Sequence, residues 1–114
     1  MEPTVGDLVR LKSGGKEMTV EDVNPIDGIT CLFFDDTGNL AQILVRPEDL
    51  VITIERETRD DFSVGDTVRL RSGGPSMTVL EYVADVHLIC SLPAGSIAST
   101  HLFLPQTLVN LNAA

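Results

Sequence analysis

The sequence predicts an all-β protein made of two tandem copies of one small barrel unit. The first observation is an internal repeat: residues 5–20 and 64–79 match at 12 of 16 aligned positions, at a constant offset of 59. The second is the apolar residues, mostly valine, isoleucine and leucine, which sit in short alternating runs as in half-buried strands. The third is the clusters of glycine, asparagine and proline between those runs, which mark turns.

The first copy is expected to hold five short strands. Two consecutive glycines, Gly14 and Gly15, supply the positive φ values of a hairpin turn after the first strand. Residues 46–49 contain a proline and predict one short helical turn before the last strand. The second copy repeats this plan with one residue lost before Pro105. The strands of the first copy are expected at residues 5–12, around 18–20 and 29–34, and at 40–45 and 50–54, with Leu50, Ile52 and Ile54 facing inward.

Charge divides the chain into unlike halves. The net charge is −9, and an apolar content of 43% is enough for a packed interior. Residues 1–61 hold 14 acids and 6 bases, or −8, whereas residues 62–114 hold 3 acids and 2 bases, or −1. This balance disfavours binding to a nucleic-acid backbone, which needs clustered lysine and arginine. Two interpretations remain: the acids keep the first half soluble, or they form a surface that meets a basic partner.

The third strand carries large apolar residues on both faces. Cys31 alternates with Leu32, so Leu32 and Phe34 lie on the face opposite the core. They are either covered by the other copy or part of a binding patch. We expect Leu32, Phe34 and the following Asp35 and Asp36 to bind a protein partner.

No motif predicts a catalytic, cofactor or metal site. The Gly-Gly-Lys run fails the phosphate-loop spacing, because Arg10 stands where that motif requires glycine. The acidic loop at residues 35–39 lacks the ligand spacing of an EF-hand. His87 and Cys90 point to opposite faces of a strand, and His101 approaches His87 only if their strands pair. No serine has an evident histidine and acid partner, so we expect no enzyme.

Cys31 and Cys90 occupy the same place in the two copies. A duplicated core position explains this better than a disulfide, since cysteine is often a small buried apolar residue. No charged leader precedes an apolar stretch, and no apolar run reaches the length of a membrane span. The sequence is therefore expected to be soluble and cytoplasmic, with no membrane contact.

The order of strands and turns resembles an SH3-like barrel, repeated in tandem. The run GDxVRLxSGGxxMTV, followed by a cysteine in the third strand, is similar to the YodC-like family of small bacterial proteins. Members of that family are about one unit long and have no assigned biochemical function, so the resemblance implies a duplicated family unit. The matching residues are Gly6, Asp7, Ser13, Gly14, Gly15, Met18, Thr19 and Cys31, then Gly65, Asp66, Ser72, Gly73, Gly74, Pro75, Met77, Thr78 and Cys90.

Each copy departs from the family pattern differently. The family carries a proline after the two glycines and a Trp-Phe pair near the cysteine. The first copy has Lys16 in the proline place but keeps an aromatic pair, Phe33-Phe34. The second keeps Pro75 and has Leu92-Pro93 in the aromatic place. If the aromatics form a ligand platform, only the first copy retains it.

We therefore predict two five-stranded SH3-like barrels, at residues 1–54 and 62–114, joined by a charged linker at residues 55–61. The predicted function is a non-enzymatic protein-interaction module that binds through the first repeat. One alternative is an acidic inhibitor or nucleic-acid mimic of the phage anti-defence type, which blocks a basic site on a nucleic-acid-processing enzyme. The other is direct nucleic-acid binding by a basic stripe, which the net charge disfavours. The stripe residues are Arg10, Lys12, Arg69 and Arg71.

Overall fold

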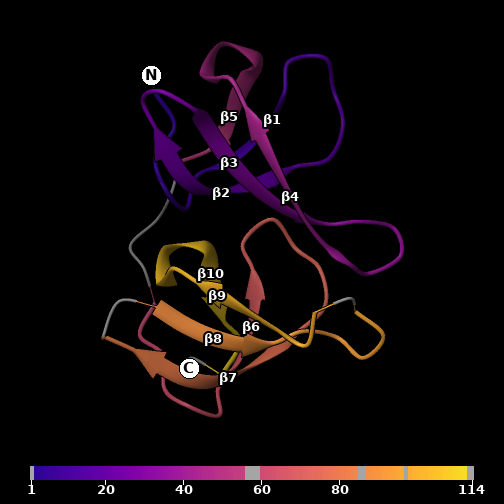
Figure 1. Cartoon of the computed structure of the whole chain (residues 1–114), viewed down its shortest axis with the longest axis vertical. Helices are drawn as coiled ribbons and strands as arrows, with labels where there is room; N and C mark the ends of the chain where they lie inside the picture. The colour runs from indigo at the N-terminus through magenta and orange to yellow at the C-terminus, as the bar shows by residue number, and fades with distance from the viewer. Residues whose placement is uncertain (1, 56–59, 85–86, 97, 113–114) are drawn as a thin grey trace.

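The regular secondary structure of the described part of the chain consists of β-strands and two short 3₁₀ turns (Figure 1). The computed structural model describes residues 2–55, 60–84, 87–96 and 98–112. Within them lie two antiparallel sheets of five strands each. The first sheet contains β1 (Leu8–Leu11), β2 (Met18–Asn24), β3 (Gly28–Phe34), β4 (Leu40–Val45) and β5 (Leu50–Ile54). The second contains β6 (Thr67–Leu70), β7 (Met77–Val83), β8 (His87–Ser91), β9 (Thr100–Phe103) and β10 (Leu108–Asn110).

Both sheets have the same strand order. In the first, β1 pairs with both β2 and β5, and β2, β3 and β4 follow as a meander. In the second, β6 pairs with β7 and β10 in the same way. A 3₁₀ turn, η1 (Pro47–Asp49) or η2 (Pro105–Thr107), precedes the last strand of each sheet. Two tandem SH3-like barrels are therefore confirmed as the fold.

The Val-Gly-Asp motif that opens each repeat is a turn and not the start of a strand. Gly6 has a φ of +93°, and its N–H donates a 2.9 Å hydrogen bond to the carbonyl of Val20. The Oδ2 of Asp7 accepts a hydrogen bond from the N–H of Thr4 at 2.8 Å. The first strand therefore begins at Leu8, three residues later than predicted. The motif recurs because the same turn feeds the first strand of the second barrel.

The barrel cores are built from the inward faces of short strands, as the alternation predicts. In the first repeat Val9, Val20 and Cys31 are fully buried, and Cys90 is fully buried in the second. Ile54 is an exception, since 53% of its surface is exposed although the alternation predicts that it faces inward. The pairing of β1 with β5 shifts register next to Leu8, so Ile54 lies beyond the regular alternation.

Burial raises the pKa of the Cys31 thiol to about 11 and that of Cys90 to about 12. Both cysteines are free. A thiolate-directed reagent at about pH 8 is therefore expected to label both cysteines only as fast as the protein opens, and rapidly in urea. The unfolded thiols ionise at lower pH than the folded ones, so stability is expected to fall as the pH rises above about 9. Rapid labelling of both thiols in the native protein would contradict this burial.

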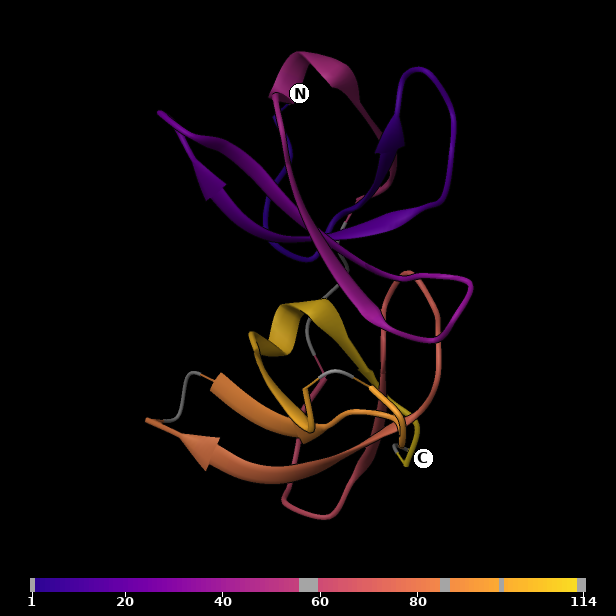
Figure 2. The ribbon, with the colours of Figure 1, turned by 45° about the vertical axis from the view of Figure 1, so that its right-hand side comes forward.

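The two repeats pack against each other through the predicted extra face of β3. Leu32 and Phe34 join the buried cluster of the second barrel, and Leu40 packs beside them. The end of the β3–β4 hairpin accordingly lies next to the β6–β7 loop in both ribbon views (Figures 1 and 2). The predicted linker falls partly on residues 56–59, which lie outside the described residues. Within that predicted linker, Oδ2 of Asp60 accepts a hydrogen bond from the N–H of Asn110 in the second repeat.

Candidate functional site

The four predicted binding residues divide into a covered pair and an accessible pair. Leu32 is fully buried and Phe34 is 8% exposed, because the second repeat covers them. These two side chains do not form an open patch, so of the two interpretations the structure shows coverage by the other copy. Asp35 and Asp36 follow directly in the β3–β4 loop, and the Asp36 side chain is 92% exposed. The binding role of this loop stays a prediction.

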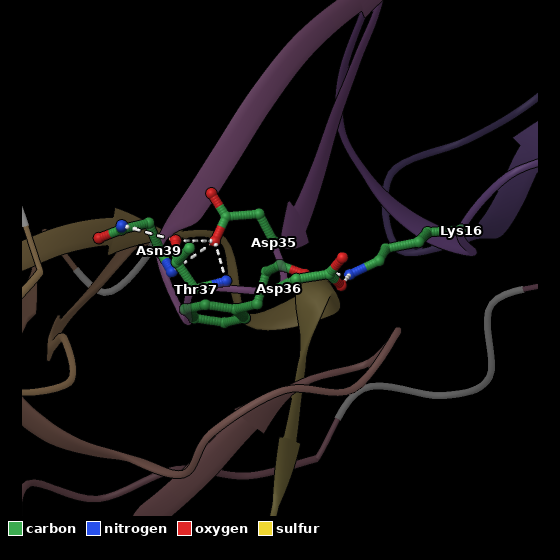
Figure 3. A network of polar contacts seen from close by, with 6 residues as sticks. Lys16, Asp35, Asp36, Thr37 and Asn39 are labelled. Atoms are coloured by element: carbon green, nitrogen blue, oxygen red, sulfur yellow. Dashed lines mark hydrogen bonds and ion pairs between the residues drawn. The ribbon is translucent and has the colours of Figure 1, made fainter.

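The β3–β4 loop is held in one shape by Asp35 (Figure 3). Its Oδ1 accepts hydrogen bonds from the hydroxyl of Thr37 at 2.6 Å, the N–H of Thr37 at 2.9 Å and the N–H of Asn39 at 3.0 Å. The Thr37 hydroxyl, followed by the Asn39 N–H, lowers the pKa of the Asp35 carboxyl. Asp35 thus acts as a local turn residue that keeps the loop ordered and negatively charged.

Asp36 and Lys16 bridge the loop to the β1–β2 turn. The Lys16 Nζ lies 2.5 Å from Asp36 Oδ1, and it also contacts the carbonyl of Phe34 at 3.4 Å. Both charged groups are half or more exposed, so the pair adds little to stability and can exchange its partner for another charge. Beside it lies a shallow hollow of about 240 Å³, here called the junction groove. It is lined by Lys16, Glu17, Phe33, Phe34, Ser72, Gly73 and Gly74.

Polar contacts between the repeats fix their docking. The hydroxyl of Thr19 donates to Ser72 Oγ at 2.8 Å and accepts from the Ser72 N–H at 2.9 Å. Nε2 of His101 lies 3.0 Å from a carboxylate oxygen of Glu21. Ser72 and His101 therefore contact residues of the other repeat, and the structure gives each of them a packing role.

The docking joins unlike surfaces of the two repeats. The first repeat contributes the outer face of β2 and β3, and the second contributes its β6–β7 loop, β9 and η2. On the second repeat, the residues aligned with Leu32 and Phe34 are Ser91 and Pro93. Smaller residues therefore stand at the two positions that the first repeat uses for docking, while Ile89 and the exposed Leu102 paired with it keep that strand face partly apolar.

The other sequence hypotheses have clear outcomes among the described residues. His101 pairs across the strand from Cys90, and His87 pairs with Val83, so the two histidines do not face each other. No group of three or more His, Cys, Asp and Glu side chains within the described ranges has the geometry to hold a metal ion. In the predicted basic stripe, Arg69 and Arg71 donate hydrogen bonds to the carbonyls of Leu70 and Gln106. Two of the four stripe residues are therefore already hydrogen-bonded within the second barrel.

A larger hollow of about 770 Å³ lies on the first repeat, and sequence reasoning missed it. It is here called the turn groove. It lies between the residues ahead of β1, the β2–β3 turn and η1, and is lined in part by Pro3, Val23, Ile26, Asp27, Arg46 and Glu48. The sequence does carry a signal for this groove: at two of its lining positions the first repeat has smaller side chains than the second. Pro3 aligns with Phe62, and Val23 aligns with Tyr82.

Comparison with known proteins shows the family. The family described as an uncharacterized small protein, DUF2158, matches residues 4–50 and again residues 63–107. The chain belongs to this family. Each DUF2158 match runs from ahead of the first strand of one sheet through its 3₁₀ turn, and the name YodC-like stays a resemblance. No curated protein matches the chain.

A search of solved structures found the crystal structure of the tandem Agenet domains 3–4 of ADCP1. It shares 14% sequence identity with the DUF2158 tandem at a TM-score of 0.39, over 94% of this chain and 79% of that one. In the described part of the chain, no helix is long and apolar enough to cross a membrane.

Proposed function

We propose that the protein is a non-enzymatic interaction module whose acidic first repeat binds a basic protein partner. The observation that supports this proposal most directly is that the two repeats differ: the second covers part of the first, and the first exposes most of the acidic side chains. The second repeat buries Leu32 and Phe34 and thereby supports the first. The first repeat presents exposed carboxylates on several loops and strands. These are Asp22, Asp27, Asp36, Glu48, Asp49 and Glu55.

Four of the described side chains with reactive potential are engaged in packing or in contacts between the repeats. The two thiols are buried, and burial keeps them protonated at neutral pH. Ser72 is hydrogen-bonded to Thr19, and His101 lies against Glu21. These contacts support a binding module over an enzyme.

Capture of partners on the immobilised protein tests the proposal. The double variant Asp22→Asn with Asp36→Asn is expected to weaken partner capture roughly fivefold, because each exposed charge contributes about 0.5 kcal/mol to a charged interface. Raising NaCl from about 50 mM to about 300 mM is expected to weaken it further through screening. The matched control is Glu81→Gln, since Glu81 aligns with Asp22 and is also exposed. Capture that ignores both salt and the double variant would contradict the proposal.

The nucleic-acid mimic is the narrower case in which the basic partner is a nucleic-acid-processing enzyme. This case is motivated by the net charge of −8 on residues 1–61. Duplex DNA added during capture separates the cases: it displaces the protein from a nucleic-acid channel and leaves any other basic partner bound.

A further inference from the structure

The first repeat has a groove lined by two residues that are smaller than their aligned partners in the second repeat. The turn groove is lined by Pro3 and Val23, and Val23 is 39% exposed. At the aligned positions of the second repeat, Phe62 is buried and Tyr82 packs against the core. The side chains at these two aligned positions are therefore larger, and pack on the core, in the second repeat.

The turn groove combines an exposed apolar side chain with a rigid backbone. Ile26, at the tip of the β2–β3 turn, is 91% exposed. The turn is fixed by Asn24, whose Oδ1 accepts hydrogen bonds from the N–H groups of Ile26 at 2.8 Å and Asp27 at 3.0 Å. An exposed isoleucine held on an ordered turn costs little conformational entropy on binding, which suits it to be a contact residue.

Charge around the turn groove selects the kind of occupant. Three carboxylates line it, those of Glu2, Asp27 and Glu48, against one guanidinium, that of Arg46. A cationic segment is therefore attracted, and the exposed apolar side chains of Val23 and Ile26 need an apolar side chain to cover them. A segment that alternates basic and apolar residues meets both requirements.

We infer that the turn groove binds a short peptide segment of the partner in which basic and apolar residues alternate. This inference rests on the proposed function and assigns its contact surface. It places the main contact at Val23 and Ile26, on the first repeat. The β3–β4 loop then adds negative charge but does not form the pocket.

The test uses a fluorescein-labelled heptapeptide of alternating lysine and leucine, with the full chain titrated and anisotropy recorded. A lysine–serine heptapeptide of equal charge is expected to bind about tenfold more weakly. Val23→Tyr inserts the side chain that the second repeat carries and keeps every charge, and it is expected to weaken binding of the lysine–leucine peptide about tenfold. Ile26→Ser is expected to weaken it about threefold.

Controls distinguish a loss of binding at the turn groove from a loss of folding and from a failure of the proposed function. Leu80→Ser removes an exposed leucine of the second repeat, 47% exposed, and is expected to leave binding within about twofold. If Val23→Tyr fails to fold, Ile26→Ser decides, because so exposed a side chain does not support the core. Equal binding of the lysine–serine peptide, or unchanged binding by the variants, would contradict peptide binding in the turn groove. It would not contradict the proposed function as an interaction module. No binding of either peptide, together with salt-insensitive partner capture, overturns both.

Discussion

Phe34→Ala is expected to destabilise the protein by about 3–5 kcal/mol, the usual cost of removing a buried phenylalanine. Phe34 belongs to the first repeat but is buried in the cluster of the second. Its loss therefore weakens the contact between the barrels as well as the packing. In urea unfolding, the single transition expected of the wild-type protein is predicted to separate into two, since coupling of neighbouring repeats depends on their interface.

Ile29→Ala is the matched control for this prediction. Ile29 is 1% exposed and belongs to the core of the first repeat alone. Its replacement is expected to cost about 2–5 kcal/mol while the transition stays single, because the interface is untouched. A Phe34→Ala protein with one unshifted or uniformly shifted transition would show that Phe34 does not couple the barrels.

Gly74→Ala is expected to cost roughly 2–4 kcal/mol, from backbone strain and from a clash across the repeat junction. Gly74 has a φ of +120°, which L-residues rarely adopt. A Cβ added there would lie 2.9 Å from Cγ of Phe34 and closer still to another ring carbon. The β6–β7 loop thus needs glycine for its shape and also for the approach of the first repeat.

Gly15→Ala separates these two costs. Gly15 is the aligned glycine of the first repeat, with a φ of +110° and no atom within 4 Å of an added Cβ. It is expected to lose only the strain, about 1–2 kcal/mol. Thermal or urea unfolding of both variants measures the difference. Equal losses in the two variants would show that the ring of Phe34 moves aside without cost.

The barrel architecture was accessible from the sequence because its signals are local. Alternating apolar runs and the turn residues between them predicted all five strands of each copy, including β4 and β5 at their observed bounds. The predicted start of β1 was wrong because the Val-Gly-Asp motif, at the predicted beginning of the strand, forms a turn. The inward assignment of Ile54 failed because pairing irregularities leave no trace in a pattern of alternation.

The contact between the two repeats could be predicted from the sequence only in part. The sequence placed Leu32 and Phe34 on the outer face and left open coverage by the other copy or a binding patch, because strand periodicity does not say what lies against a face. The aligned Ser91 and Pro93 show that the second repeat does not carry the two docking side chains, a comparison that becomes meaningful once the unlike surfaces are seen. The turn groove was missed because a missing side chain is visible only against its aligned partner, as with Val23 and Tyr82.

The asymmetry of the two repeats follows from this docking. The first repeat has Leu32 and Phe34 on its outer β3 face, where the second has Ser91 and Pro93. Beside its acid-lined turn groove the first repeat has Val23, where the second has Tyr82. Under the proposed function, the second copy supports the first and the first copy makes the contact.

Unfolding of the wild-type protein in urea, followed by two signals, tests the central claim that the second barrel supports the first through Leu32 and Phe34. Tyr82 is the single tyrosine of a chain without tryptophan, so its fluorescence reports the second repeat, while far-ultraviolet circular dichroism reports both. Coincident midpoints are predicted for the wild-type protein, because the two barrels share one buried cluster. Separate midpoints in the wild-type protein would contradict the claim, since the barrels would then fold independently of their contact.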